Sequence, residues 1–316
     1  MNDGTVEIVR YDASRRSEWN RFVAQSKNGT FLFDRNYMDY HSDRFADHSL
    51  MCYVKGRLYA LLPANIREDT LFSHQGLTYG GLVMSAHCTT VHLMEIVRKM
   101  NEGLREEGIR RVVYKAVPWI YHLVPAEEDL YAIHHECRYT LLERDISSTV
   151  MLQRPLGWKK DRRHGLKKAT ESGIAVGQSA DYATFWNILT HNLETCHGVS
   201  PVHSLNEILL LQQRFPHNIM LFAGHKDGEM LGGCVVYVTP QVVHAQYISA
   251  TPEGKRLGVV DAIIHHLFFE AFPQFTYFDF GKSTEQHSDT LNENLIYQKE
   301  GFGARGVCYD TYTWEL

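Results

Sequence analysis

The stretch that decides the fold reads Val242-Val-His-Ala-Gln-Tyr-Ile-Ser-Ala250, then Thr251-Pro-Glu-Gly-Lys-Arg-Leu-Gly258, then an apolar segment from Val259 to Phe272. The first part is strand-like, the second is a basic turn with glycines, and the third is apolar over the length of a helix. This order places the N–H groups of a helix start beside two basic side chains. The stretch therefore predicts an α/β fold with a phosphate-binding turn, after which a helix begins near Leu257.

The turn has the chemistry of an anion site. Unpaired N–H groups and the helix dipole favour an anion, and Lys255 and Arg256 add positive charge. Gly258 would let a pyrophosphate approach the backbone closely. A plain surface turn is the alternative, because one glycine and two basic residues occur together in many loops.

The chain is long enough for two domains. It has 316 residues, 44% apolar and 22% charged, which is the composition of a globular protein with one or two cores. Similar hairpin signals at Lys55-Gly56-Arg57 and Asp227-Gly228-Glu229 indicate two lobes of one kind. We therefore expect residues 1–150 and 151–316 to form two related lobes with mixed α/β structure.

Charge and hydropathy narrow the location and the partners. The formal net charge of −5 argues against a protein that coats nucleic acid, although a local basic patch can still bind phosphate. Residues 1–16 lack an apolar signal region, and no run approaches the roughly 18 apolar residues that span a bilayer. We expect a cytoplasmic protein without a membrane span.

Histidines are frequent, at 18, but their spacing does not suit a metal. His191, His197 and His203 recur at six-residue spacing, which does not match the i, i+4 pair of a helical metal site. None of the six cysteines lies in a C-x-x-C pair. We expect no metal and reduced cysteines.

A basic segment begins the second half. Residues 158–168 carry six Lys or Arg against one Asp. On a helical wheel the cations Lys159, Lys160, Arg163 and Lys167 fall within about a 100° arc, beside an arc with Trp158, Leu166 and Ala169. Two interpretations stay open: a connecting helix with a solvated face, or an acceptor-binding helix that holds an anion through Lys159, Arg163 and Lys167.

The second half resembles the GNAT acyltransferase superfamily. The resemblance rests on the hairpin 223–238, the strand, turn and helix over 247–267, and the ending Tyr297-x-Lys299-x-Gly301-Phe302. It implies that residues 255–259 (Lys255, Arg256, Leu257, Gly258 and Val259) receive the pyrophosphate of an acyl-CoA, and that Tyr297 protonates the departing thiolate. Two positions depart from the family pattern: Val260 replaces the last small residue of the turn, and Thr290 replaces the usual asparagine.

A closer likeness is to the two-lobed FemABX-like branch, including BioF2-like acetyltransferases. Arg163-His-Gly-Leu-Lys-Lys-Ala-Thr-Glu-Ser-Gly173, Tyr277-Phe-Asp-Phe-Gly281 and Lys299 are similar to its motifs. The likeness implies two fused GNAT-like lobes, a degenerate one over 1–150 and the acyltransferase over 151–316. In peptidoglycan-building members the donor is aminoacyl-tRNA and the acceptor is a cell-wall precursor.

Both resemblances imply one chemical step. An amine attacks an activated acyl carbon, N–H groups near Ser249 and Ala250 stabilise the oxyanion, and Tyr297 acts as the acid. His244 is a candidate base, although a lone strand histidine is more often structural. Lys299 is either a phosphate anchor or a helix cap. Strict alternation would place His244 and Gln246 on one face of the strand, and Tyr247 and Ser249 on the other.

Three functions therefore remain open. The first is an N-acyltransferase that moves an acyl group, expected to be acetyl, from acetyl-CoA or another acyl-CoA to a small-molecule or cell-wall-precursor amine. The second is aminoacyl transfer from tRNA to a cell-wall precursor. The third is a non-catalytic protein that keeps the two-lobed shape and binds an anionic ligand.

Overall fold

The computed structural model describes residues 6–285 and 290–316. The chain divides into two compact units, Met1–Asp145 with Cys308–Leu316, and Ile146–Val307. The last residues of the chain return to the first unit. They do so because the end of strand β15 (Arg305–Glu315) pairs antiparallel with β8 (Arg111–Lys115).

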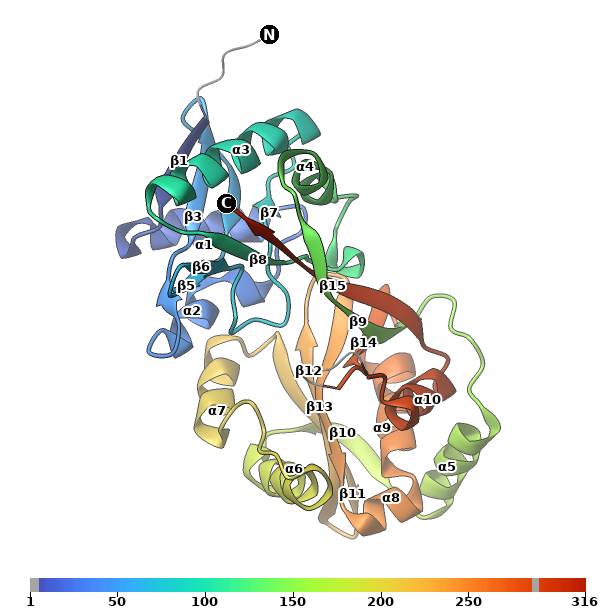
Figure 1. Ribbon diagram of the computed structural model, residues 1–316. Coiled ribbons are helices and arrows are strands. Elements are labelled where there is room, and N and C mark those ends of the chain that lie inside the picture. The colour runs from blue at the N-terminus through green and yellow to red at the C-terminus, as the bar shows by residue number, and fades with distance from the viewer. Residues whose placement is uncertain (1–5, 286–289) are drawn as a thin grey trace. The chain divides into compact units, whose positions relative to one another are not determined.

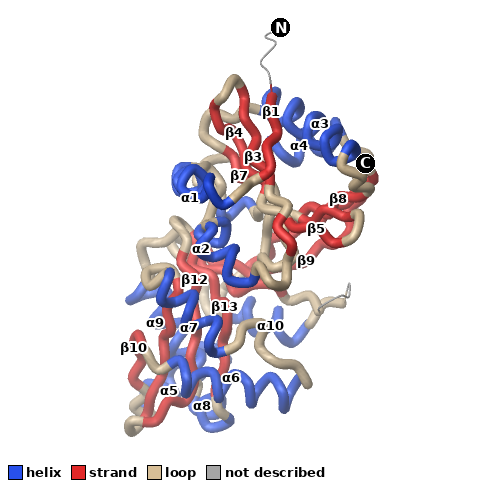
Figure 2. Tube along the Cα trace, turned by 90° about the vertical axis from the view of Figure 1, so that its left-hand side faces the viewer, coloured by secondary structure: helices blue, strands red, loops and turns tan. Residues whose placement is uncertain are grey.

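The first unit contains a small antiparallel sheet and a helical layer. The sheet has the order β1-β3-β4-β7, and helices α3 and α4 lie side by side in Figure 2. The four strands of this sheet are β1 (Val6–Arg10), β3 (Leu50–Val54), β4 (Arg57–Leu62) and β7 (Val83–Met84). The first unit also contains β2 (Ala46–Asp47), β5 (Asn65–Arg67), β6 (Thr70–Phe72) and β8, which belong to the larger sheet. Its helices are α1 (Arg16–Gln25), α2 (Arg35–Met38), α3 (Thr90–Glu106) and α4 (Glu128–Glu136), with 3-10 turns η1 (Ala13–Arg15), η2 (Phe31–Phe33), η3 (Asp39–His41) and η4 (Trp119–Tyr121).

The second unit is a twisted sheet with helices on both faces. Strands β10 (Ala175–Ser179), β11 (Ile219–Lys226), β12 (Glu229–Val238), β13 (Val242–Ala250), β14 (Tyr277–Lys282) and β9 (Thr140–Met151) are neighbours in this order. In Figure 1, α6 (Tyr182–His197) and α7 (Leu205–Arg214) lie on one side of β11 to β13, and α9 (Val259–His266) lies on the other. Beside α9 lie α5 (Lys160–Glu171), α8 (Pro252–Leu257), the π-helical turn η5 (Leu267–Ala271) and α10 (Glu293–Gly301).

The two predicted hairpins are both present. Each has a two-residue turn in the left-handed region, with φ of 52° and 73° at Lys55-Gly56 and 52° and 84° at Asp227-Gly228. Such turns match the twist of the flanking strands, and Gly adopts them without steric cost. The local signal was therefore sufficient in both lobes.

The glycine-rich segment 76–84 is mostly irregular. Residues 76–84 form a strand only at Val83–Met84, and the preceding glycines lie in bends. Gly80 explains this, since a Cβ there would lie 1.5 Å from the carbonyl oxygen of Ser73. The glycines accommodate a close crossing of two chain segments, not a regular ladder.

The face assignment on β13 is wrong, because the strand contains a β-bulge. The register with β12 shifts between Val235 and Val236, so that Gln246 is the extra residue. His244 is paired with Tyr237, and Tyr247 with Val235, so the bulge brings His244 and Tyr247 to the same face. Ser249, opposite Gly233, shares that face.

The core of the second unit lies between β11–β14 and α9. Ile263, Ile264 and Leu267 of the predicted apolar helix are fully buried there, with Phe278 of β14. Within the described ranges, 6–285 and 290–316, no helix has the length and apolar character to cross a membrane.

Candidate functional site

The basic turn folds differently from the prediction. Helix α8 begins at Pro252, not near Leu257, and Thr251 caps it by accepting a hydrogen bond from the N–H of Gly254 at 3.0 Å. Proline at the first helical position after a threonine cap explains the early start. A second helix, α9, begins after Gly258, which has φ of 80° and provides no side-chain cap.

The predicted pyrophosphate residues have other contacts. Leu257 and Val259 are core residues, 4% and 0% exposed. A Cβ on Gly258 would lie 2.2 Å from the carbonyl oxygen of Gly165, so this glycine permits close packing of α5. The approach that the sequence assigned to a ligand is thus occupied by a neighbouring helix.

The two cations of the turn are at the surface. The Nζ of Lys255 donates to the Oδ1 of Asn192 at 2.5 Å, and the Nε of Arg256 donates to the Oε2 of Glu253 at 2.8 Å. The Arg256–Glu253 ion pair is well exposed, at 61% and 48% of the two side chains. An exposed pair of this kind is weak, so a phosphate could compete for the guanidinium.

Strands β13 and β14 separate soon after they meet. Their parallel pairing covers three positions, ending at His244 and Asp279, although β13 continues to Ala250 and β14 to Lys282. Beyond this fork, β13 has a partner ladder with β12 on its other edge. The N–H of Thr251 donates to the carbonyl oxygen of Leu231 on β12. The N–H groups of two consecutive residues in a strand point to opposite edges. The N–H of Ala250 therefore points to the edge that faces β14.

A buried acid and a histidine lie at the fork. Asp279 is fully buried, and its Oδ2 accepts a hydrogen bond from the Nδ1 of His244 at 2.9 Å. Its Oδ1 accepts from the hydroxyls of Ser147 at 2.5 Å and Thr149 at 3.1 Å, and from the N–H of Gly281 at 3.3 Å. A carboxylate with this many donors is stabilised in its charged form and orients the imidazole ring.

Lys299 lies next to this cluster. Its Nζ donates to the carbonyl oxygens of Gly281 at 2.8 Å and Lys282 at 2.7 Å, joining α10 to the end of β14. Burial lowers the pKa of Lys299 to about 8, an effect that the nearby charge of Asp279 opposes. The ammonium group of Lys299 thus binds the carbonyl oxygens at the end of β14. This role resembles capping more than it resembles a phosphate anchor.

Tyr297 lies on a different side of α10. It is 57% exposed, whereas Lys299, two residues later, is 7% exposed. The Nζ of Lys159 lies 3.8 Å from the centre of the Tyr297 ring, a cation–π contact. The structure therefore brings together one predicted catalytic residue and one predicted acceptor-binding residue.

Helix α5 has the predicted two-sided character. Ala169 is buried, whereas Arg163 and Lys167 are exposed, and Lys167 approaches Glu171 at 3.6 Å. Lys159 is the N-cap residue, and its N–H donates to the carbonyl of Gly301 at 2.8 Å. Lys159, at the start of the stripe, thus lies beside the end of α10.

Two buried acids of the second unit, Asp279 and Asp261, were not assigned a role from sequence. Asp279 lies in a motif that the resemblance singled out, and its role depends on contacts with Ser147 and Thr149, more than 100 residues earlier. Asp261 is the other: its Oδ1 lies 3.2 Å from the Nη1 of Arg162, and burial raises its pKa to about 6, against the attraction of Arg162. No local signal reveals either pairing.

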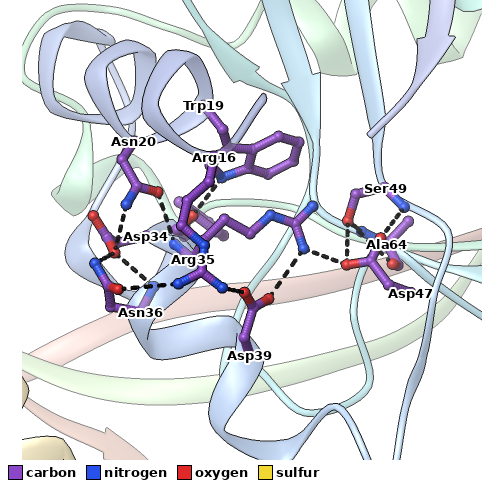
Figure 3. Close-up of polar contacts among 11 residues, drawn as sticks. Arg16, Trp19, Asn20, Asp34, Arg35, Asn36, Asp39, Asp47, Ser49 and Ala64 are labelled. Atoms are coloured by element: carbon purple, nitrogen blue, oxygen red, sulfur yellow. Dashed lines mark hydrogen bonds and ion pairs between the residues drawn. The ribbon is translucent and has the colours of Figure 1, made fainter. Parts of the chain in front are cut away.

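The first unit has a buried polar cluster of another kind (Figure 3). Arg35 is fully buried, and its guanidinium carbon lies 3.5 Å from the ring centre of Tyr11 and 4.1 Å from that of Trp19. One nitrogen of the guanidinium contacts the carboxylates of Asp47 and, at 3.5 Å, Asp39. This cluster holds α2 against α1.

Metal ligands do not gather in the part of the chain that the structure describes: no group of three or more His, Cys, Asp or Glu side chains there could hold an ion. The side chains of Cys196 and His197 are outside the described set.

Part of the second half of the chain matches a known protein family. Residues 159–288 match the family model of the acetyltransferase (GNAT) domain. No curated protein matches the sequence of the chain. The matched segment contains the fork, the two successive helices α8 and α9, and helix α5. Tyr297 and Lys299 lie outside it.

Solved structures resemble the chain over nearly its full length. A crystal structure of FemX has a TM-score of 0.70 at 10% identity, with 98% of this chain and 97% of that chain covered. The L-PGS structure from Bacillus licheniformis has a TM-score of 0.60 at 12% identity, with 96% and 91% covered. A tandem GNAT protein from the clavulanic acid biosynthesis pathway has a TM-score of 0.54 at 11% identity, with 98% of each chain covered.

These similarities define the class of protein. The chain has the two-lobed GNAT/FemX-like fold, in which two GNAT-like lobes are fused. The domain match and the fold together support an acyltransferase.

Proposed function

We propose that the second unit transfers an acyl group, acetyl in the simplest case, from a CoA thioester to an amine. The fork between β13 and β14, with His244 and Asp279 where the strands part, is the observation that carries this proposal. A forked pair of parallel strands offers open backbone groups at one edge and a histidine–carboxylate pair at its base. Acyl transfer to an amine needs both an oxyanion donor and a base.

The open edge of β13 supplies the binding groups for the donor. The amide groups of a CoA arm can add to this edge as an extra strand does, by main-chain hydrogen bonds. In that position the N–H of Ala250, one residue beyond Ser249, is the donor for the oxyanion. Lys255 and Arg256 would exchange their exposed contacts for the phosphates of CoA.

The proposed reaction is one addition followed by one elimination. The amine nitrogen attacks the thioester carbon while His244 takes the proton of the amine, and Asp279 stabilises the imidazolium. The tetrahedral intermediate collapses, the carbon–sulfur bond breaks, and Tyr297 protonates the thiolate. His244 has the accessible position for this work, since its side chain is 12% exposed whereas that of Asp279 is fully buried.

A titration of the whole chain with acetyl-CoA in a calorimeter tests the donor. We expect saturable binding that falls sharply in Lys255→Glu/Arg256→Glu and is unchanged in His244→Ala. A matched control, His217→Ala, removes an exposed histidine of the loop before β11 and should change neither binding nor turnover. No detectable heat from acetyl-CoA would remove the proposal.

The basic stripe of α5 favours one alternative, aminoacyl transfer from charged tRNA. Lys159, Arg163 and Lys167 could neutralise an RNA backbone. Incubation with a mixture of radiolabelled aminoacyl-tRNA separates the two donors: amino-acid transfer that is lost on neutralising these three residues, without acetyl-CoA binding, would replace the CoA donor by tRNA.

A further inference from the structure

An exposed surface at the start of α5 combines apolar and cationic side chains. We call it the α5 entry surface and define it by Arg154, Leu156, Lys160 and Phe269. Leu156 is 48% exposed and Phe269 is 47% exposed, and both cations are exposed as well. Single exposed apolar residues are ordinary, so the argument depends on whether these lie together.

Two aromatic contacts bring the apolar members to one place. The ring of Trp158, two residues after Leu156, lies 6.4 Å from the ring of Phe269 and 5.0 Å from that of Phe302. The backbone of Leu156 packs on Gly303, where a Cβ would lie 2.5 Å from the carbonyl oxygen of Leu156. Leu156 and Phe269 therefore flank the same turn of the chain, immediately before the first residues of α5.

The charge of this region opposes that of the rest of the chain. Residues 154–168 carry seven Lys or Arg and one Asp, in a protein whose formal net charge is −5. Of the basic residues, Arg162 is turned inward to Asp261. Arg154, Lys160 and Arg163 remain exposed, and they lie two, four and seven residues from Leu156 in the sequence.

We propose that the α5 entry surface docks the protein on an anionic phospholipid bilayer. Leucine and phenylalanine side chains enter the boundary between headgroups and acyl chains, and cations beside them attract anionic headgroups. RNA would use the same cations, but it offers no apolar layer for an exposed leucine. The pairing of Leu156 with Phe269 thus favours the lipid surface.

The inference rests on the proposed function in one respect only: Lys159, Arg163 and Lys167, which the sequence offers as candidate acceptor-binding residues, continue from the same surface along α5. An acceptor presented at a membrane would meet them there. Docking itself is measured without any donor or turnover, so its failure is distinguishable from failure of the acyltransferase proposal.

Vesicle sedimentation of the full chain tests the docking. We expect binding to phosphatidylcholine vesicles that contain about 30% phosphatidylglycerol, and none to pure phosphatidylcholine. Arg154→Glu/Lys160→Glu should weaken the partition coefficient at least about twentyfold, since each basic side chain near such a surface contributes about fivefold. Leu156→Ser/Phe269→Ser should weaken it as well. The matched control Lys55→Glu/Arg57→Glu reverses two exposed charges in the first unit and should leave binding unchanged.

Each other outcome overturns the proposal. It fails if neither vesicle binds, if both bind equally, or if the Lys55/Arg57 control weakens binding as much as Arg154→Glu/Lys160→Glu does. It also fails, in favour of RNA, if total tRNA binds the chain and only the charge-reversed variant, not Leu156→Ser/Phe269→Ser, loses that binding. Unchanged circular dichroism and thermal midpoints in all variants establish that the substitutions act at the surface.

Discussion

Two buried charged clusters, one around Arg35 in the first unit and one around Asp279 in the second, have different roles. In the first unit, Arg35 is enclosed by the rings of Tyr11 and Trp19 and held by Asp47 and Asp39. In the second, one carboxylate oxygen of the fully buried Asp279 accepts hydrogen bonds from two hydroxyls and one N–H. The other oxygen accepts a hydrogen bond from His244.

The two clusters differ in the groups that the buried charge contacts. The charge of Arg35 meets two aromatic faces and the carboxylates of Asp39 and Asp47, whose side chains are 28% and 35% exposed, and it holds α1, α2 and the strand at Asp47 together. The charge of Asp279 ends on a ring at the fork, which a substrate can reach. The comparison teaches that a buried charge marks a functional site when its partner is itself a candidate acid or base, and not merely because it is buried.

Removal of Arg35 should have the largest effect on stability. Arg35→Ala leaves two carboxylates without their buried partner and opens space between two rings, so we expect the free energy of unfolding to fall by about 3–5 kcal/mol. Urea denaturation measures it. Arg16→Ala removes a half-exposed partner of Asp39 and should lower the same free energy by less than about 1 kcal/mol. Equal losses would show that Arg35 is not the centre of its cluster.

The next largest effect is a pH dependence from Lys299. Because its pKa falls from 10.5 to about 8 on folding, the unfolded chain binds more protons between these values, and stability from this group rises with pH in that window. Relative to Lys299→Met, the wild type should gain up to about 3 kcal/mol from pH 8 to 10.5, at about 1.4 kcal/mol per pH unit.

The measurement is urea denaturation of both proteins across that pH range. Lys167→Met, at an exposed lysine, provides the matched control and should follow the wild type at every pH. A stability difference between wild type and Lys299→Met that does not vary with pH would mean that Lys299 stays charged throughout.

The third prediction concerns catalysis at the fork. Asp279→Asn removes the negative charge that stabilises the imidazolium of His244, so we expect the rate of acyl transfer to fall about a hundredfold, or about 2.7 kcal/mol, with donor affinity unchanged. The pH profile of the remaining activity should shift, which a merely structural substitution would not cause. Asp227→Asn, in a hairpin turn, should retain full activity. An unaltered rate in Asp279→Asn would show that the cluster around Asp279 has a structural role, as the cluster around Arg35 does, and not a catalytic one.

The smallest effect is expected at Tyr297. Tyr297→Phe keeps the ring under Lys159 but removes the hydroxyl, and we expect about a tenfold loss of turnover, since a thiolate leaves with little help from an acid. The loss should appear in kcat and not in the KM for the donor. Tyr297→Leu, which also removes the cation–π contact, should raise the KM for the acceptor. Full turnover by Tyr297→Phe would assign the proton to another group.

Local signals predicted much of the fold and little of the site. The left-handed turns at Lys55-Gly56 and Asp227-Gly228 depend on neighbours in sequence, and both hairpins were confirmed. The start of α8 was misplaced because the threonine cap and Pro252 outweighed the glycine on which the prediction relied. The bulge at Gln246 shifts the register of β13, and nothing in the strand sequence announces it.

The fork cluster itself was beyond reach for a different reason. His244 was a candidate, but its partner comes from β14, and the hydroxyls that fix that partner come from β9. Contacts of this kind depend on which strands are neighbours, and that order is decided by the packing of the whole unit. The resemblance pointed to the right strand, and only the three-dimensional register assigned the atoms.

The return of β15 to β8 has a consequence for how the protein is made. Arg111 on β8 and its partner Glu315 are 204 residues apart, so one edge of the first unit stays open until all of the second has left the ribosome. At translation rates of about 5–20 residues per second, that interval is on the order of 10–40 s. An unpaired strand edge exposed for that long is a site for wrong pairing, and the nascent chain should need chaperone protection at that stage.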